Sequence, residues 1–265
     1  MKVTISRFET EGKITLQESG GLAIVTMHRP KLKNAMTNGM WLELSEVAKQ
    51  IVKNPKNKVV LLKGNKGQFT AGSDIKQFSQ LSINEANDAF KSMEEAISSF
   101  EKLPLPTIAL INGPAMGAGF ELALACDLRI GTKDIKMGMP VGRLGITLNK
   151  QFVNRIINFI GKSRTLDLVY TGRLIDANEG LQWGLLNYLI AEDKDIVHYG
   201  LTIAQKIMEQ SPASLLAVKR SAAYSLPNYS IPWDSEVSKS VDPYDFPEGV
   251  QAFLEKRKPN FKRRV

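Results

Sequence analysis

The chain has 265 residues, with 43% hydrophobic and 23% charged residues and a formal net charge of +8 at pH 7. This composition is typical of a soluble globular protein. No apolar run approaches the roughly 20 residues that a membrane-spanning helix needs, and the first residues lack the apolar segment of a secretory signal peptide. Cys126 is the one cysteine, so an internal disulfide is excluded, and we expect a buried thiol in a cytoplasmic protein.

The positive charge is compatible with nucleic acid, with a phosphorylated small molecule or with a solvated basic surface. Lysines and arginines are spread along the chain, and the densest clusters are residues 256–258 and 262–264. This spread favours a solvated surface, so we do not expect a nucleic-acid partner. His28 and His198 are the two histidines, and with a single cysteine they predict no His/Cys metal site.

Hydrophobic periodicity and turn signals divide the chain into alternating strands and helices. Strands are predicted at residues 14–16, 22–27, 59–62, 107–111, 128–130 and 185–190. Helices are predicted at residues 41–52, 86–100, 120–126, 152–160, 166–170, 196–209, 212–225 and 248–256, the first of them capped by Thr37. The pattern predicts an α/β core over residues 1–194 and a helical C-terminal region over residues 195–265.

The stretch 107–126 carries the strongest local signal, because an apolar strand, a turn, a glycine-rich segment and a buried helix follow one another. Three interpretations are open. A dinucleotide fingerprint would need glycine where Leu122 stands, so it is excluded. The stretch could be a tight turn in which Glu121 faces the first turn of a helix. Alternatively, backbone N–H groups at the start of the helix could stabilise developing negative charge, with Glu121 transferring a proton.

Several segments favour the last interpretation, because together they resemble the crotonase superfamily, the enoyl-CoA hydratase/isomerase family. These segments are residues 29–36, 69–75, 112–127, 171–173 and 248–259. They cover nearly the whole chain in the order that the family has. The resemblance implies a spiral of ββα units whose C-terminal helical region closes the coenzyme A pocket and forms trimers or hexamers.

The resemblance also implies a substrate and a site. The substrate would be an acyl-CoA thioester, with coenzyme A entering as part of the substrate and no separate cofactor. The backbone N–H groups of Ser73 and Ala118 would stabilise a thioester enolate, and Glu121 would be the acid or base. The adenine would lie near residues 71–75, and lysines would contact the phosphates. The implied binding residues are Lys31, Lys33, Ala35, Ala71, Asp74, Ile75, Gly117, Val141 and Lys256.

One departure leaves the reaction open. The hydratases carry a second catalytic glutamate where this chain has Val141, and valine cannot activate water. Our leading hypothesis is enolate chemistry with Glu121 as the single carboxylate. A second hypothesis is decarboxylation of a malonyl-type CoA, favoured by the apolar Val141 and Leu148. Family decarboxylases carry further polar residues at positions that are Ser73 and Leu148 here. A third hypothesis is a CoA-binding or RNA-binding protein with little catalysis.

Overall fold

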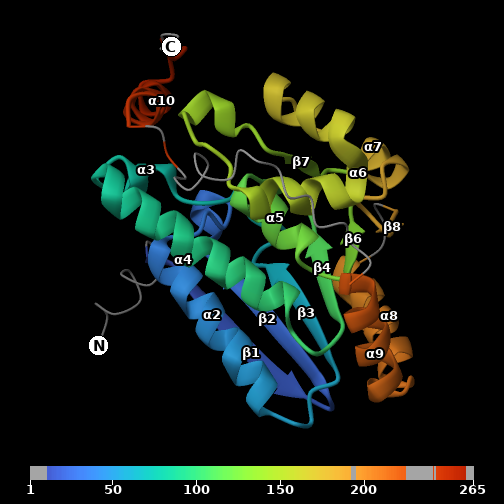
Figure 1. The fold of residues 1–265 in the computed structure, drawn as a ribbon. Helices are drawn as coiled ribbons and strands as arrows, with labels where there is room; N and C mark the ends of the chain where they lie inside the picture. The colour runs from blue at the N-terminus through green and yellow to red at the C-terminus, as the bar shows by residue number, and fades with distance from the viewer. Residues whose placement is uncertain (1–10, 192–194, 225–240, 242, 261–265) are drawn as a thin grey trace, which may run out of the picture.

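The computed structural model describes residues 11–191, 195–224, 241 and 243–260 (Figure 1). The main sheet has six strands in the order β1-β2-β3-β4-β6-β8, with β1 antiparallel to β2 and the other neighbours parallel. Its strands are β1 (Lys13–Ser19), β2 (Leu22–His28), β3 (Val59–Gly64), β4 (Thr107–Ile111), β6 (Leu128–Gly131) and β8 (Tyr188–Leu189). A second, two-stranded sheet pairs β5 (Pro114–Met116) with β7 (Lys136–Gly138).

The chain winds through these two sheets as a spiral of ββα turns. β4, β5 and α5 (Ala118–Leu124) form one turn, and β6, β7 and the helices before β8 form the next. Before them, β3 leads to Thr70, which bridges to Ala115 on β5 and precedes α3 (Ile75–Phe78). Each turn places one strand in the main sheet and one segment beside the second sheet, so the predicted α/β spiral is confirmed.

Helices cover both faces of the main sheet, which explains its continuous apolar strands. On β3, Val60 and Leu62 belong to the core shared with α2 (Asn38–Lys53) and α4 (Ile83–Glu101). The alternate residues Val59 and Leu61 belong to a second core, which includes residues of α8 (Ile196–Met208). The period of two along a strand therefore divides its side chains between two cores.

Further helices surround the second sheet or follow it in the chain (Figure 1). They are η1 (Pro30–Leu32), η2 (Val141–Leu144), α6 (Lys150–Thr171), α7 (Ala177–Gln182), α9 (Pro212–Tyr224) and α10 (Asp245–Leu254). α10 contacts η2 and α3, so the described part of the C-terminal region packs against elements that lie much earlier in the sequence. The helices predicted after residue 194 are therefore present, although the predicted end at residue 225 and the boundary residue 194 lie outside the described residues.

Of the local predictions, the two helices within α6 are confirmed, one predicted strand is too long, and two short strands were missed. The helices predicted at 152–160 and 166–170 both lie in α6, where the non-helical backbone of Gly161, with a φ of 73°, separates them by a kink. The strand predicted at 185–190 is confined to Tyr188–Leu189, because the N–H groups of Leu185 and Leu186 both donate to the carbonyl of Gly180 at the end of α7. The short strands β5 and β7 were not predicted, since three residues are too few to establish a period.

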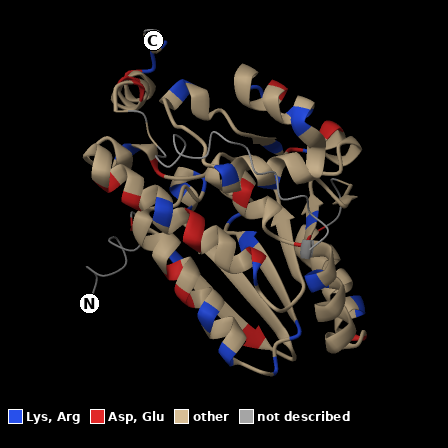
Figure 2. Ribbon diagram, in the orientation of Figure 1, with Lys and Arg blue, Asp and Glu red and all other residues tan. Residues whose placement is uncertain are grey.

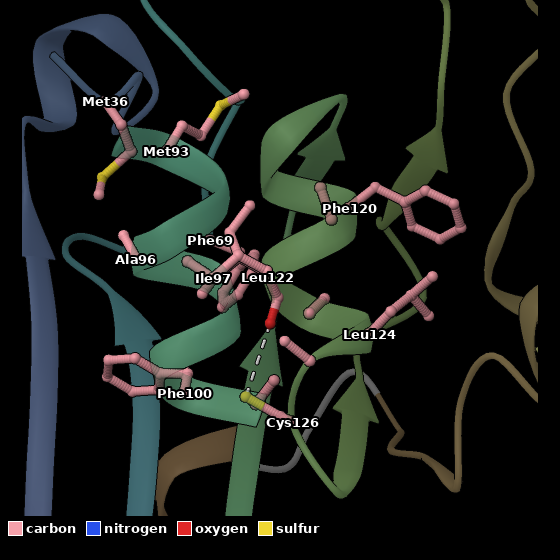
Figure 3. Close-up of a cluster of buried hydrophobic side chains, with 14 of the residues drawn as sticks. Met36, Phe69, Met93, Ala96, Ile97, Phe100, Phe120, Leu122, Leu124 and Cys126 are labelled. Atoms are coloured by element: carbon pink, nitrogen blue, oxygen red, sulfur yellow. Dashed lines mark hydrogen bonds between the residues drawn. The ribbon is translucent and has the colours of Figure 1, made fainter. Parts of the chain in front are cut away.

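An apolar core joins α4 to α5 and sets the position of the glycine-rich segment. Figure 3 shows Ile97 and Phe100 of α4 beside Leu122 of α5 and Cys126 just after it. The Cys126 thiol donates to the carbonyl of Leu122 at 3.7 Å, and burial raises its pKa to about 12. Cys126 is therefore an unreactive core residue, as the sequence predicted.

Candidate active site

A pocket of about 510 Å³ opens between the second sheet, α3, η2 and α10. It lies beside the glycine-rich segment, because Gly117 and Ala118 form part of its wall. Most of the wall is apolar, including Phe78, Phe90, Met93, Ile146, Leu148, Phe152 and Phe253. Charged side chains also line it at Lys33, Asp134 and Lys136. This composition suits a ligand with a long apolar part and an anionic part.

Two glycines bring the loop before α3 into contact with the segment before α5. A Cβ at Gly72, whose φ is +93°, would lie 2.4 Å from the carbonyl oxygen of Met116 and 3.6 Å from the amide nitrogen of Ala118. A Cβ at Gly119 would lie 2.7 Å from the Thr70 methyl group. Only residues without a side chain allow this approach, so the two glycines determine how closely the loops meet.

The approach places two backbone N–H groups at the pocket wall. Ser73 forms a parallel bridge with Met36, in which the bonds run from Met36 N–H to the Gly72 carbonyl and from Asp74 N–H to the Met36 carbonyl. In this pattern the N–H of the central residue points away from the partner strand. Ala118 is the first residue of α5, where the helix uses no N–H group. Neither N–H is used in the hydrogen bonds of the described backbone.

Some of the predicted site residues line this pocket and others do not. Those that line it are Lys33, Ala71, Ser73, Ile75, Gly117, Ala118 and Val141. Those that do not are Lys31, Ala35, Asp74, Glu121 and Lys256. The α10 residue that lines the pocket is Phe253, and Lys256 follows the end of that helix with a φ of 54°.

Asp74 and Ala35, two of the residues expected to bind coenzyme A, take part in contacts within the protein. The Asp74 side chain caps α3 by accepting from the N–H of Lys76, and it forms a 2.8 Å ion pair with Arg29. Arg29 also donates to the carbonyl of Ala35 at 3.0 Å. Arg29 is buried and therefore holds the first loop to the turn after β2.

Glu121 lies in a buried site that also contains a charged partner. Its side chain is 0% exposed, and its Oε2 accepts a 2.8 Å hydrogen bond from Arg155 on α6. Arg155 also pairs with Glu94 and Glu101 of α4, each at 2.9 Å. Glu121 Oε1 has no hydrogen-bond partner among the described residues. Ala118, one turn earlier on α5, lines the pocket, whereas Glu121 does not.

Burial raises the pKa of Glu121 to about 8, and Arg155 opposes this shift. The direction follows first from burial, which disfavours the charged carboxylate, and the negative charges of Glu94 and Glu101 add to it. Two carboxylates on a single guanidinium already leave one negative charge in excess, and ionised Glu121 would add a second. Glu121 is therefore mostly protonated near pH 7, and it is poised to donate a proton rather than to accept one.

This pKa predicts a pH dependence of stability. The native state holds the Glu121 proton more tightly than the unfolded chain, whose carboxyl has an ordinary pKa near 4.5. Relative to Glu121→Gln, wild-type stability is greatest below that value and falls by about 1 kcal/mol per pH unit as the pH rises toward about 8. Urea unfolding of both proteins between about pH 5 and 9 measures the difference. A difference that stays constant across this range would contradict the raised pKa.

The sequence reasoning missed Arg155 and two charged residues of the pocket wall, Asp134 and Lys136. Arg155 lies three residues after Phe152, in the stripe of buried side chains on α6. A charged residue in such a stripe implies a buried partner, so the signal was present although it did not identify Glu121. Lys136 begins β7, a strand that the sequence did not predict, and Asp134 lies two residues before it.

Comparison with known protein families agrees with this fold. The family model described as enoyl-CoA hydratase/isomerase matches residues 17–264. The chain belongs to the enoyl-CoA hydratase/isomerase family. Residues 69–75 and 112–127, which form the two facing loops, lie within the matched region.

Individual relatives span almost the whole chain. A probable enoyl-CoA hydratase of Bacillus subtilis is 32% identical over 255 residues, which cover 94% of this chain and 98% of the relative. A solved structure of an enoyl-CoA hydratase/carnithine racemase from Magnetospirillum magneticum has a TM-score of 0.77 at 30% identity, covering 94% of this chain and 95% of that one. An enoyl-CoA hydratase from Bacillus anthracis also has a TM-score of 0.77, at 28% identity, covering 94% and 98%. This enoyl-CoA hydratase/isomerase family member is therefore an enzyme that acts on acyl-CoA.

The described residues contain neither a cluster of side chains suited to binding a metal ion nor a helix suited to crossing a membrane. No group of three or more His, Cys, Asp or Glu side chains among them is arranged to hold a metal ion. No described helix is both long and apolar enough to span a bilayer. Figure 2 shows basic and acidic residues mixed along the helices, including α2 and α4, rather than a basic face alone.

Proposed function

We propose that the chain binds an acyl-CoA thioester in this pocket and stabilises its enolate between the N–H groups of Ser73 and Ala118. The observation that carries the proposal is the pair of unused N–H groups on facing loops, beside a mainly apolar cavity. An enolate oxygen gains negative charge in the transition state, and losing one donor from a comparable hole costs about 2.7–4 kcal/mol.

The coenzyme A part of the substrate would occupy the polar side of the pocket. The adenine would lie near Ala71 and Ile75, which line the wall, and Lys33 would contact the phosphates. Lys31 and Lys256 would act outside the lined surface, where the longer part of the substrate leaves the pocket. Asp74 would contribute by capping α3 and holding this loop in place.

Glu121 would exchange a proton with the α-carbon of the acyl group. Its raised pKa favours the protonated form, and its Oε1 is the buried atom without a partner among the described residues. Because the side chain does not line the pocket, it would have to move toward the pocket when a thioester is bound. Catalytic hydrogen bonds commonly tighten only in the substrate complex, so the position without substrate is compatible with this role.

Turnover of a panel of enoyl-CoA thioesters by wild type and Glu121→Gln tests the proposal. Glutamine preserves the shape and can still accept from Arg155, but it cannot transfer the proton. We expect the variant to lose about 10²–10⁴-fold in rate with little change in acyl-CoA affinity. Glu46→Gln, an exposed acidic position on α2, is the matched control and should keep full activity. Equal rates for wild type and Glu121→Gln would remove Glu121 from the mechanism.

A second candidate reaction is decarboxylation of a malonyl-type CoA. Val141 and Leu148 line the pocket where a second carboxylate would be needed for hydration. A substrate carboxylate against this apolar wall would be poorly solvated, which favours its loss as carbon dioxide. The electron pair of the broken bond would form the same enolate, and a proton would then add at the α-carbon. Release of carbon dioxide from methylmalonyl- or ethylmalonyl-CoA would support this reaction, and intact thioesters after incubation would exclude it.

We also propose a homotrimer or homohexamer in the cytoplasm. Residues 195–265 would mediate self-association and close the coenzyme A pocket. The exposed apolar side chains Leu201 on α8 and Val218 on α9 support an interface, and Phe253 at the pocket wall supports closure. The cytoplasmic location is supported by the buried, unpaired Cys126, whose thiol needs no oxidising compartment.

A further inference from the structure

A side chain outside the main pocket holds the loop that contributes the first N–H group. Trp41 lies on α2, is 2% exposed, and donates from its indole Nε1 to the Ser73 hydroxyl at 3.2 Å. The same hydroxyl contacts Met93 Sδ on α4 at 3.1 Å. The Ser73 side chain is therefore held between two helices of the core, whereas its N–H belongs to the pocket wall.

The contact with Trp41 adds to several other attachments of the segment around Ser73. The carbonyl of Gly72 and the N–H of Asp74 both bond to Met36, and Asp74 also pairs with Arg29. These bonds hold the neighbours of Ser73, whereas the attachments of Ser73 itself are those of its hydroxyl to Trp41 and to Met93. Losing the hydrogen bond from Trp41 would leave the weaker contact with the sulfur, so the Ser73 N–H could tilt.

The conformational freedom of Gly72 makes a fixed attachment at Ser73 important. Gly72 has a φ of +93° and, as glycine, can adopt many backbone conformations. Its N–H is held by the Thr70 hydroxyl at 3.1 Å, which orients the residue before Ser73 but not Ser73 itself. A small tilt matters because donors must aim at the position that the oxyanion will occupy.

We infer that Trp41 is a positioning residue that aims the Ser73 N–H at the thioester carbonyl through the Ser73 hydroxyl. The inference rests on the proposed binding of a thioester at this wall, and it assigns a role to a residue that does not touch the substrate. Plain core packing would require the indole ring but not its N–H group. The two roles can therefore be separated by removing the N–H group alone.

The test compares Trp41→Phe, Ser73→Ala and the double variant with the wild type. Phenylalanine keeps an aromatic ring in the core and removes the donor, and Ser73→Ala removes the acceptor at the other end of the same bond. The measurement is the affinity for a saturated acyl-CoA thioester relative to its thioether analogue, which lacks the carbonyl. This ratio reports hydrogen bonding to the carbonyl oxygen and requires no turnover.

We expect each single variant to lower the thioester preference by about tenfold, with no further loss in the double variant. Affinity for the thioether should stay at the wild-type value. An unchanged thioester preference in Trp41→Phe would overturn the inference, as would additive losses in the double variant. Equal weakening of thioester and thioether binding would assign Trp41 a purely structural role.

Hydrogen exchange of the ligand-free protein tests the same attachment independently of the proposed function. The Asp74 amide is bonded to Met36 at 2.8 Å, and tilting of the segment would break this bond. We expect faster exchange at Asp74 in both single variants and no change at Met40, whose N–H caps α2 through Thr37. If the wild type binds neither ligand, the proposed function fails while exchange still decides the role of Trp41. Unchanged exchange at Asp74 would contradict that role.

Discussion

Replacing Arg155 with methionine is expected to lower the free energy of unfolding by about 3–5 kcal/mol, because it leaves buried carboxyl groups without their shared partner. Arg155 is 5% exposed and bonds to Glu94, Glu101 and Glu121. Glu94 and Glu121 are themselves largely or fully buried. They can avoid an unpaired charge only by taking up protons, so the loss should grow as the pH rises.

Urea unfolding at neutral pH measures this loss against a matched control. Lys49→Met removes the positive partner of an exposed pair with Glu46, in which both side chains are more than half exposed, and should change stability by less than about 1 kcal/mol. Combining Arg155→Met with Glu121→Gln should cost less than the sum of the single changes, since the two residues share one interaction. A loss as small as that of the control would show that the cluster contributes little to stability.

The second large effect is expected at Gly72, where alanine should reduce turnover by about 10²-fold or more. Its Cβ would overlap the carbonyl oxygen of Met116, and its φ of +93° disfavours any side chain. The loop that carries Ser73 must then move away from Ala118, so the two N–H groups can no longer bind one oxygen atom. The effect should appear in turnover and in thioester preference, with a smaller change in thioether affinity.

Gly20→Ala is the control for this change. Gly20 lies in the turn between β1 and β2 with a φ of +57°, and a Cβ there would meet nothing within 4 Å. Gly20→Ala therefore places a side chain at a residue with positive φ, which has a conformational cost, but it creates no overlap between the loops. Similar turnover in the wild type, Gly72→Ala and Gly20→Ala would mean that the approach of the two loops does not create the oxyanion site.

The sequence predicted most of the fold because long elements have clear periods. The helix after Thr37 and the apolar strands β3 and β4 follow from spacing alone. The short strands β5 and β7 do not, because their pairing depends on the spiral as a whole. The break at Gly161 was predicted, because the sequence already divides α6 into two helical stretches.

The parts of the candidate site that consist of backbone groups and glycines could be predicted from the sequence. The glycines at 72, 117 and 119 place the loops of Ser73 and Ala118 at one wall, as the resemblance implied. Side-chain partners distant in sequence were less accessible to prediction. The pairing of Arg155 with Glu121 spans 34 positions, and that of Arg29 with Asp74 spans 45. No local pattern specifies such pairs, so the direction in which a charged side chain points was the main source of error.

The infrared band of a bound thioester carbonyl tests the central claim most directly. A saturated acyl-CoA labelled with carbon-13 at the carbonyl binds without requiring turnover, and its band can be separated from that of the protein by the isotope shift. Two hydrogen bonds from Ser73 and Ala118 should polarise the carbonyl and move the band to lower frequency than in water, and Gly72→Ala should reverse much of that shift. A band at its solution frequency in protein shown to be saturated with the thioester would contradict the proposed oxyanion site.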